Sequence, residues 1–306
     1  MDKRKQPRQP SKPVSRVGSM DRVSPTIPIR DIAMSRSWEG VSHRKPWETE
    51  VTAVIPCLDT PECVEVLVEL LSLQTIKPNI VLIDTGSTQK HIGALRELER
   101  LNEHVELHEL RFKGVIHASD PVAIAMDLAF SACATPYLFA THADCFPMRK
   151  DLLEHLVSVM KLQDVPVAGH EITPRVGLEV AGWVGHTATM FDMGFCDEHG
   201  LGWSQRRCCK LSGNSHRGNS TLGGYPDTEF LINEQLDKLD QQFGKPHRFI
   251  TGKEENYKTT KDDLITHVRS YVSAKVYSSD HFIRASRDMD EAMVVASKNI
   301  LEWKTY

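Results

Sequence analysis

Two stretches, Val51-Thr-Ala-Val-Ile-Pro-Cys-Leu-Asp59 and Ile80-Val-Leu-Ile-Asp-Thr-Gly-Ser87, decide the fold class. Each begins as a short run of apolar, mostly β-branched residues and ends in a polar turn, which predicts two buried strands. Between them, residues 61–73 carry apolar side chains three and four positions apart, with Glu residues between them, which predicts a helix. The chain therefore opens as strand, helix, strand.

The same alternation continues to about residue 160. Further strands are expected at 105–110 and 137–140, and further helices at 91–101, 120–133 and 152–162. Asp120 followed by a proline matches a helix N-cap with Pro at the first helical position. Strands that alternate with helices predict an α/β fold, a mostly parallel central sheet with helices on both faces.

The second half has a less regular pattern. Residues 163–225 are rich in Gly, His and Trp and are expected to form the loops of a pocket, and residues 244–263 are expected to be a polar loop. The periodic segments there predict a helix at 227–239, a strand within 264–271 and a C-terminal amphipathic helix within 288–303. The expected domain is 46–306, made of a ligand-binding half (51–160), an irregular half (161–280) and the last helix (281–306).

Residues 1–45 differ from the rest in composition. They hold eleven Lys/Arg and four Asp/Glu, a balance of +7, whereas the whole chain has a net charge of -4. The segment is rich in Pro and Ser and lacks an apolar period, so a disordered leader is expected, with nucleic-acid or anionic-lipid binding as the alternative. The acidic remainder does not favour a nucleic-acid enzyme.

The chain shows neither an export signal nor a membrane span. No stretch reaches the roughly 20 consecutive apolar residues that a transmembrane helix needs, and the basic leader has no apolar core of a signal peptide. Seven cysteines, an odd number, favour reduced thiols and a cytoplasmic location. Peripheral contact with a membrane is compatible with such a location. The vicinal pair Cys208-Cys209 lacks the spacing of a zinc motif, and a structural zinc site there is the weaker alternative.

Acidic side chains follow three of the predicted strands. Asp59, Asp84 and Asp144 each stand just after one. In open parallel sheets ligands bind beyond the carboxyl ends of the strands, so the three carboxylates are expected at one metal-binding cleft. We expect Asp84 to face solvent or a ligand there. An ordinary Asx-type turn is the alternative for Asp84.

The order and spacing of the motifs resemble family 2 glycosyltransferases. The resemblance rests on Val54-Ile-Pro-Cys-Leu-Asp59, Leu70-Leu-Ser-Leu-Gln-Thr75, Val81-Leu-Ile-Asp-Thr-Gly-Ser87, Ala123-Ile-Ala-Met-Asp127 and Thr135-Pro-Tyr-Leu-Phe-Ala-Thr-His-Ala-Asp-Cys-Phe-Pro147. It covers residues 51–160 well and 165–270 loosely. It implies a GT-A (Rossmann-like) fold with an irregular acceptor-side second half, and an enzyme that moves a sugar from a UDP- or GDP-sugar to an acceptor hydroxyl.

The resemblance also implies the nucleotide and metal residues. Asp84 would contact the base, and a carboxylate can accept from a base imide N–H. The nucleotide would further be bordered by Pro56, Asp59, Gly86, Ser87 and His142. Asp144 matches the last acid of the family's Asp-x-Asp motif, which binds Mn²⁺ or Mg²⁺ at the diphosphate. His142 replaces the first acid; because imidazole suits Mn²⁺ better than Mg²⁺, a metal site can survive the change.

The remaining site residues come from the second half. Asp227 matches the general base that deprotonates the acceptor in inverting relatives, although acids in a first helical turn are also favoured by the helix dipole. His267 matches a late metal ligand, with His186 and His247 as competitors, and Arg269 and Lys258 could offset diphosphate charge. Trp183, Trp203 and Glu229 are expected on the acceptor side, with core packing as the alternative for the two tryptophans.

Three functions remain open at this stage. The first is a metal-dependent, inverting glycosyltransferase with a nucleotide-sugar donor and an unknown glycan, lipid or small-molecule acceptor. The second is a catalytically impaired nucleotide-sugar-binding protein, which the histidine at 142 favours. The third is a nucleotidyltransferase, which would usually carry a Gly-rich, basic phosphate loop after the first strand, where this chain has Pro56-Cys-Leu-Asp-Thr-Pro61. No GxGxxG motif follows a strand, which disfavours a dinucleotide-binding dehydrogenase.

Overall fold

The computed structural model describes residues 32–34, 47–112, 120–172, 182–203, 228–254, 259–268 and 279–305. Its largest element is an eight-stranded sheet of order β1-β4-β3-β2-β5-β8-β7-β9. These strands are β1 (Ile32–Met34), β2 (Val51–Cys57), β3 (Asn79–Asp84), β4 (Val105–Phe112), β5 (Tyr137–Ala140), β7 (Val167–Glu171), β8 (Thr189–Asp192) and β9 (Arg248–Lys253).

Four neighbouring strands form the parallel centre that the sequence predicts. β2 pairs in parallel with β3 on one side and with β5 on the other, and β4 pairs in parallel with β3. Their burial is nearly complete, as in the all-buried pattern of β3, because helices cover both faces of a parallel sheet. The α/β class and the mostly parallel sheet are thus confirmed.

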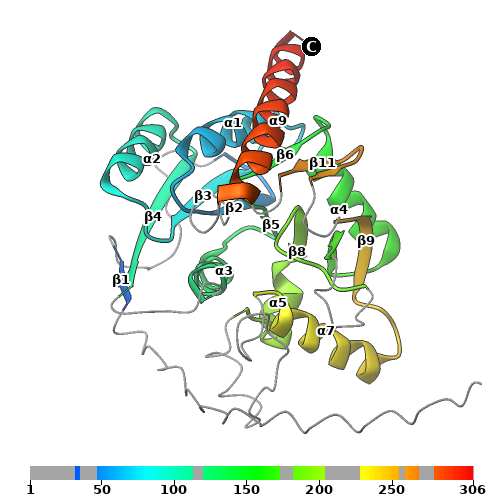
Figure 1. Ribbon diagram of the computed structural model, residues 1–306. Helices are drawn as coiled ribbons and strands as arrows, with labels where there is room; N and C mark the ends of the chain where they lie inside the picture. The colour runs from blue at the N-terminus through cyan, green and yellow to red at the C-terminus, as the bar shows by residue number, and fades with distance from the viewer. Residues whose placement is uncertain are drawn as a thin grey trace, which may run out of the picture.

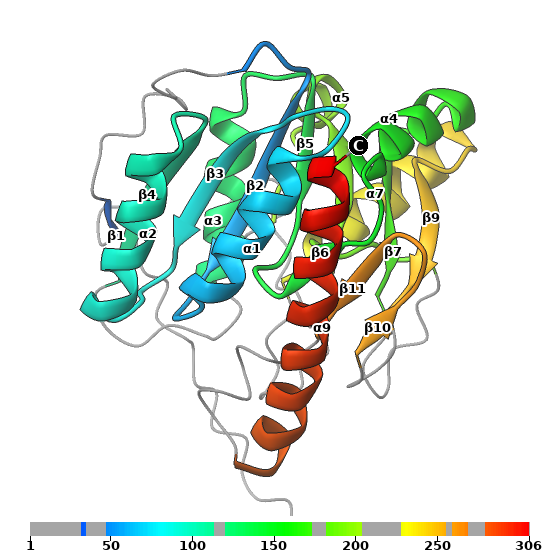
Figure 2. The same ribbon diagram turned by 90° about the horizontal axis from the view of Figure 1, so that it is seen from above.

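Helices cover both faces of the sheet. In the described part of the chain they are α1 (Pro61–Ser72), α2 (Gln89–Leu101), α3 (Asp120–Ala132), α4 (Leu152–Gln163), α5 (Met193–His199), α7 (Phe230–Phe243) and α9 (Ser279–Thr305). Side chains of α1, α2, α4 and α9 form one buried cluster, and side chains of α3, α5 and α7 form a second. Figure 1 shows α1, α2 and α9 on one side of the sheet and α3, α5 and α7 on the other. The turned view in Figure 2 shows α9 running beside α1, with which it is in contact.

The second half contains more regular structure than its composition predicts. β7, β8 and α5 lie in 163–225, and β9 lies in 244–263, so the expectation of loops is wrong for these segments. β8 runs antiparallel between β5 and β7, and β9 is parallel to β7. These strands are short and contain Gly, Thr and His, so no apolar run marks them in the sequence. They become strands because neighbouring strands, on both sides of β7 and β8 and on one side of β9, complete their backbone hydrogen bonds.

A small second sheet packs beside the first. It has the order β10-β11-β6, with β6 (Cys145–Pro147), β10 (Thr260–Lys261) and β11 (Ile265–His267). The strand expected within 264–271 is therefore confirmed as β11. The helix expected at 227–239 begins later, at Phe230, because residues 228 and 229 form a turn. The C-terminal helix is longer than the expected 288–303.

The expectation of disorder in residues 1–45 is wrong for Ile32–Met34. This segment pairs antiparallel with β4, and Ile32 lies opposite Phe112. Backbone hydrogen bonds to an available sheet edge hold such a strand, and composition does not reveal them. Residues 1–31 and 35–46 lie outside the described part of the chain.

Two findings bear on the environment of the protein. No helix in the described ranges combines the length and hydrophobicity that crossing a bilayer requires. All five cysteines in the described ranges are free thiols: Cys57, Cys63, Cys133, Cys145 and Cys196. Cys208 and Cys209 lie outside these ranges.

Candidate active site

Strand order places the candidate site where β2 and β5 lie side by side. β2, β3 and β4 extend the sheet in one direction, and the chain then returns to add β5 on the other side of β2. Such a reversal opens a crevice at the carboxyl ends of the two central strands. Asp59 follows β2, and His142 and Asp144 follow β5. The chain thus brings its most chemically distinctive residues to the expected crevice.

Antiparallel pairing in the small sheet brings His267 to Asp144. β6 starts one residue after Asp144, and β11 pairs with it so that His267 lies opposite Cys145. The backbone N–H of Val268 donates to the carbonyl of Asp144 at 3.0 Å, which fixes this register. As a result, Nε2 of His267 lies 3.5 Å from Oδ1 of Asp144, and both side chains are 4% exposed. Two of the residues that the family resemblance names as metal ligands thus lie side by side.

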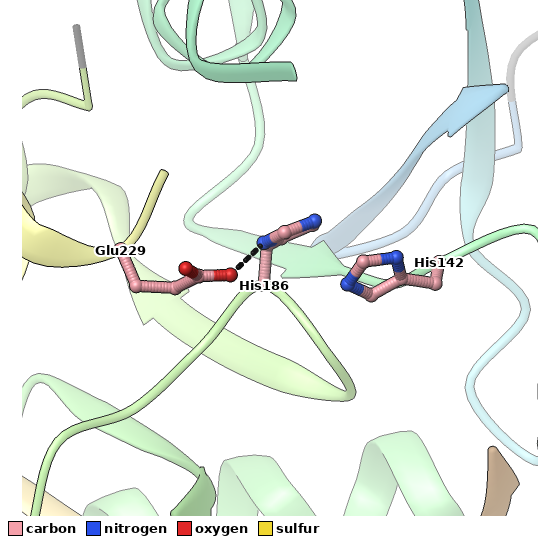
Figure 3. A group of neighbouring side chains, drawn as sticks. All are labelled: His142, His186 and Glu229. Atoms are coloured by element: carbon pink, nitrogen blue, oxygen red, sulfur yellow. Dashed lines mark ion pairs between the residues drawn. The ribbon is translucent and has the colours of Figure 1, made fainter. Parts of the chain in front are cut away.

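The pairing of β5 with β8 brings His186 to His142. Ala140 lies opposite Thr189, and the chain continues beyond both strand ends on the same edge of the sheet. The rings of His142 and His186 lie with their centroids 3.8 Å apart, and the ring of His142 is 5.0 Å from that of His267. Nδ1 of His186 is 2.8 Å from Oε1 of Glu229, just before α7. Figure 3 shows this row of Glu229, His186 and His142.

Glu254 is a site residue that the sequence analysis missed. It directly follows β9, whose parallel pairing with β7 brings its carboxyl end to the same edge of the sheet as that of β5. Oε1 of Glu254 lies 3.5 Å from Nδ1 of His267, and the Glu254 side chain is 3% exposed. In the sequence, Glu254 stands directly after residues 248–253. It can be recognised as an acid at a strand end only once these residues are known to form a strand.

The two buried carboxylates hold positive charge on His267. Burial alone would lower the pKa of His267, but hydrogen bonding and charge from Asp144 and Glu254 outweigh it and raise that pKa to about 9. Burial alone would raise the pKa of Asp144, and the facing His267 holds it below its usual value instead. Loss of solvation, together with the neighbouring His186 and His267, holds the pKa of His142 well below its usual value. These shifts favour a neutral imidazole at His142 and a protonated one at His267, which would have to give up a proton to bind a cation.

Side chains at this edge fit a divalent cation. His142, Asp144 and His267 each offer a ligand atom, and these atoms lie within 4.8 Å of one another. Oδ1 of Asp144 is buried, and its contact with His267 is longer than a typical charge-assisted hydrogen bond. One carboxylate and two imidazoles suit Mn²⁺ or another transition metal better than Mg²⁺, because Mg²⁺ prefers oxygen ligands.

The turns after β2 and β3 are joined by hydrogen bonds. The backbone N–H of Asp59 donates to the Ser87 hydroxyl at 2.8 Å, and the N–H groups of Gly86 and Ser87 donate to the Asp84 carboxylate. Asp84 also pairs with Arg111 at 2.6 Å and is fully buried. Asp84 therefore does not face solvent, because its own turn encloses the carboxylate in the Asx-type arrangement that was the alternative.

The Asp59 side chain contacts residues at the start of α2. Its Oδ1 accepts from the backbone N–H of Thr88 at 2.8 Å and lies 2.7 Å from Nδ1 of His91. Burial alone would raise the pKa of Asp59, but these contacts outweigh it and lower the pKa. The φ angle of Asp59 is 51°, the left-handed region that aspartate tolerates better than most residues. Pro56, within β2, lies opposite Ile83 in the register with β3.

The two tryptophans are part of the core. Trp203 is 1% exposed and packs edge-on against Phe130 and Phe191. Trp183 is 7% exposed and donates from its indole to Asp237. Their faces are covered, so the core-packing alternative describes them better than sugar stacking.

The other predicted residues do not all lie in this group. His247 is buried against Asp240, which holds it at α7. Asp227, Lys258 and Arg269 lie outside the described residues. Of the two competitors for a ligand role, only His186 joins the cluster.

A buried amide positions His186 and Glu229. Asn233 accepts from the Val184 N–H at 2.9 Å and donates to the carbonyls of Val184 and Glu229 at 2.7 and 2.8 Å. Asn233 is fully buried on α7. It therefore holds the chain before β8 against the residues that begin α7.

Replacing Asn233 by leucine should lower the free energy of unfolding by about 3 kcal/mol, because buried backbone groups of Val184 lose their partners. Urea denaturation followed by circular dichroism measures the change. The matched control is Asn299→Leu on α9, whose amide makes only a 4.0 Å contact with the sulfur of Met148. Equal stability changes for the two variants would contradict the positioning role of Asn233.

Compared with known proteins, the chain is similar to solved structures in fold but has little sequence similarity to them. No protein-family profile matches the chain. A curated relative, the flavin-dependent oxygenase ucdD of Aspergillus ustus, is 30% identical over 104 residues. That match covers 33% of this chain, and the chain spans only 16% of the length of that protein.

Solved structures that resemble the chain include glycosyltransferases of the GT-A type. The mannosyltransferase PcManGT of Pyrobaculum calidifontis, solved with GDP-Man and Mn²⁺, has a TM-score of 0.47 at 14% identity over 86% of this chain and 77% of its own. Glucosyl-3-phosphoglycerate synthase of M. tuberculosis, solved with Mg²⁺ and UDP, has a TM-score of 0.43 at 11% identity over 70% and 76%. TarS 1-349 of S. aureus has a TM-score of 0.39 at 10% identity over 51% and 50%, so this chain spans half of that one. At these identities the likeness concerns the fold alone.

Proposed function

We propose that the protein is a metal-dependent glycosyltransferase that moves a sugar from a UDP- or GDP-sugar to an acceptor hydroxyl. The observation that carries the proposal is the placement of Asp144 and His267, 3.5 Å apart, at the carboxyl edge of a parallel sheet where the strand order reverses. The resemblance of residues 51–147 to family 2 glycosyltransferases implies a nucleotide sugar at the same edge. Ligand placement at such an edge is the general rule for open α/β sheets.

Each part of the site has a role in this proposal. Asp144 and His267, with His142, would hold a divalent cation, which supplies positive charge to the diphosphate leaving group. The Pro56–Asp59 turn and the turn at Gly86 and Ser87 would border the nucleotide. Asp84 would hold that second turn in shape through its bonds to the two N–H groups, with Arg111 beside it.

The acceptor side supplies the base. A sugar hydroxyl is a poor nucleophile until it loses its proton, so an inverting transfer needs a general base near the acceptor. Asp227 matches the family's base by its position two residues before Glu229. The base takes the hydroxyl proton, the acceptor oxygen bonds to the anomeric carbon, and the nucleoside diphosphate leaves with the electron pair of the broken bond.

The decisive measurement is release of nucleotide from a panel of UDP- and GDP-sugars with Mn²⁺ and a mixture of acceptors. Turnover that stops with EDTA and with Asp227→Asn supports the proposal. Metal-dependent binding of UDP or GDP without turnover supports instead the non-catalytic binding protein that His142 suggested. Absence of nucleotide binding under all metal conditions would overturn both readings.

A further inference from the structure

His142 belongs to two groups of metal-ligating side chains. The first is His142, Asp144 and His267, which the proposed function uses. The second is His142, His186 and Glu229, whose ligand atoms also lie within 4.8 Å of one another. The proposed transfer gives His186 and Glu229 no task as ligands. Figure 3 shows the second group approaching from the ends of three different segments.

The second group offers the same kinds of ligand as the first, two imidazoles and one carboxylate. Two imidazoles and one carboxylate form a set that Zn²⁺ and neighbouring transition metals accept, with one coordination position left open for water or another ligand. Mg²⁺, which prefers oxygen ligands in an octahedral arrangement, is poorly served by it. The second group therefore favours the same kind of ion as the first, a transition metal over Mg²⁺.

The ligands of this group are held close together. Oε1 of Glu229 lies 2.8 Å from Nδ1 of His186, with side chains 13% and 5% exposed. On the other side of His186 lies the ring of His142, with centroids 3.8 Å apart. Metal ligands bind best when their geometry is fixed beforehand, and little movement is needed here.

The surrounding structure fixes these positions. Asn233 ties Val184, two residues before His186, to the Glu229 carbonyl. A Cβ on Gly185 would lie 2.6 Å from Cγ2 of Ile172, so the absence of a side chain lets this segment pass close to its neighbour. The ring of His186 also packs edge-on against Trp203 at 6.0 Å.

We propose that His142, His186 and Glu229 form a second metal site, which binds a transition metal such as Zn²⁺ without nucleotide. A neutral imidazole has one lone pair to offer, so His142 binds one ion at a time. An ion at the second site therefore withdraws His142 from the group of Asp144 and His267. Zn²⁺ should then raise the Mn²⁺ concentration needed for nucleotide binding at the neighbouring site.

The test uses the full chain, stripped of metal by a chelator, and Zn²⁺ or Co²⁺ as the only ligand. Calorimetry should give one Zn²⁺ per chain, and both His186→Gln and Glu229→Gln should lower the affinity at least tenfold, as losses at metal sites typically do. Asp144→Asn, which alters only the first group, should leave this affinity within a factor of about three, because it touches no ligand of the second group. His247→Gln is the control for loss of a buried histidine outside both groups.

Two further readouts keep the test decisive. Co²⁺ at nitrogen and oxygen ligands gives visible bands without the near-ultraviolet thiolate band that binding at the cysteines would produce, and circular dichroism confirms that each variant is folded. If Glu229→Gln and His186→Gln fold and still bind Zn²⁺ with wild-type affinity, the proposal is overturned. The same holds if Asp144→Asn alone abolishes binding. Since no nucleotide sugar is present, failure of the glycosyltransferase proposal would not alter these results.

Discussion

Replacing Asp144 by asparagine should reduce the affinity for UDP in the presence of Mn²⁺ by about 100-fold, the upper end of what loss of a metal-site group costs. The carboxylate is buried, lies 3.5 Å from His267 and has a pKa below its usual value, so it is charged at neutral pH. An amide of the same shape removes that charge. It therefore leaves a weaker, neutral oxygen ligand and removes the attraction between the site and a divalent cation.

Calorimetric titration of UDP in Mn²⁺, in Mg²⁺ and in EDTA measures this effect. Asp151→Asn is the matched control, because Asp151 pairs with Arg149 at the start of α4 and belongs to neither ligand group. The variant affinity in Mn²⁺ should approach that of the wild-type protein in EDTA. Wild-type binding of UDP that is indifferent to EDTA would show that Asp144 holds no metal in the nucleotide complex.

The substitution Gly169→Ala should lower the free energy of unfolding by about 3 kcal/mol, at the top of the usual range for overpacking a core. Gly169 lies in β7, and a Cβ there would clash with Oγ1 of Thr189 and lie 2.7 Å from its Cβ and Cγ2. Thr189 is fully buried and short, so it cannot swing away. Because Thr189 begins β8 just after His186, the strain falls on the strand that positions the candidate site.

Gly93→Ala is the matched control for this substitution. Gly93 lies in α2, and a Cβ there meets no atom within 4 Å. The control should gain about 0.5–1 kcal/mol of stability, since glycine is unfavourable within a helix. Guanidinium denaturation of both variants gives the comparison, and a Gly169→Ala protein as stable as the wild type would show that β7 and β8 can separate at no cost.

The sequence was sufficient for the first half of the fold. Apolar β-branched runs such as 51–55 and 80–83 are buried on both faces, so their composition alone marks them as central strands. Between them, the apolar spacing of α1 predicts a helix that covers the sheet. The local pattern agrees with the tertiary position there, which is why the order of the strands and helices from 51 to about 160 could be derived, apart from the short strand β6.

The same reasoning failed for β7, β8 and β9. β7 and β9 each contain a glycine, a residue depleted in strands, and β8 is only four residues long; the burial of β9 is also only partial. Their strand conformation comes from pairing with one another and with β5. A propensity scale contains no information on such long-range pairing.

The sequence by itself determined that Asp144 and His142 follow a buried strand and lie at the carboxyl edge of a parallel sheet. Only the tertiary structure decided which partners meet them there. His267 reaches Asp144 through the register of β11 with β6, and His186 reaches His142 through the register of β8 with β5. Strand periodicity tells which face a side chain takes, whereas the partner strand and its register depend on contacts between distant parts of the chain. For that reason Glu254 could not be found before the fold was known.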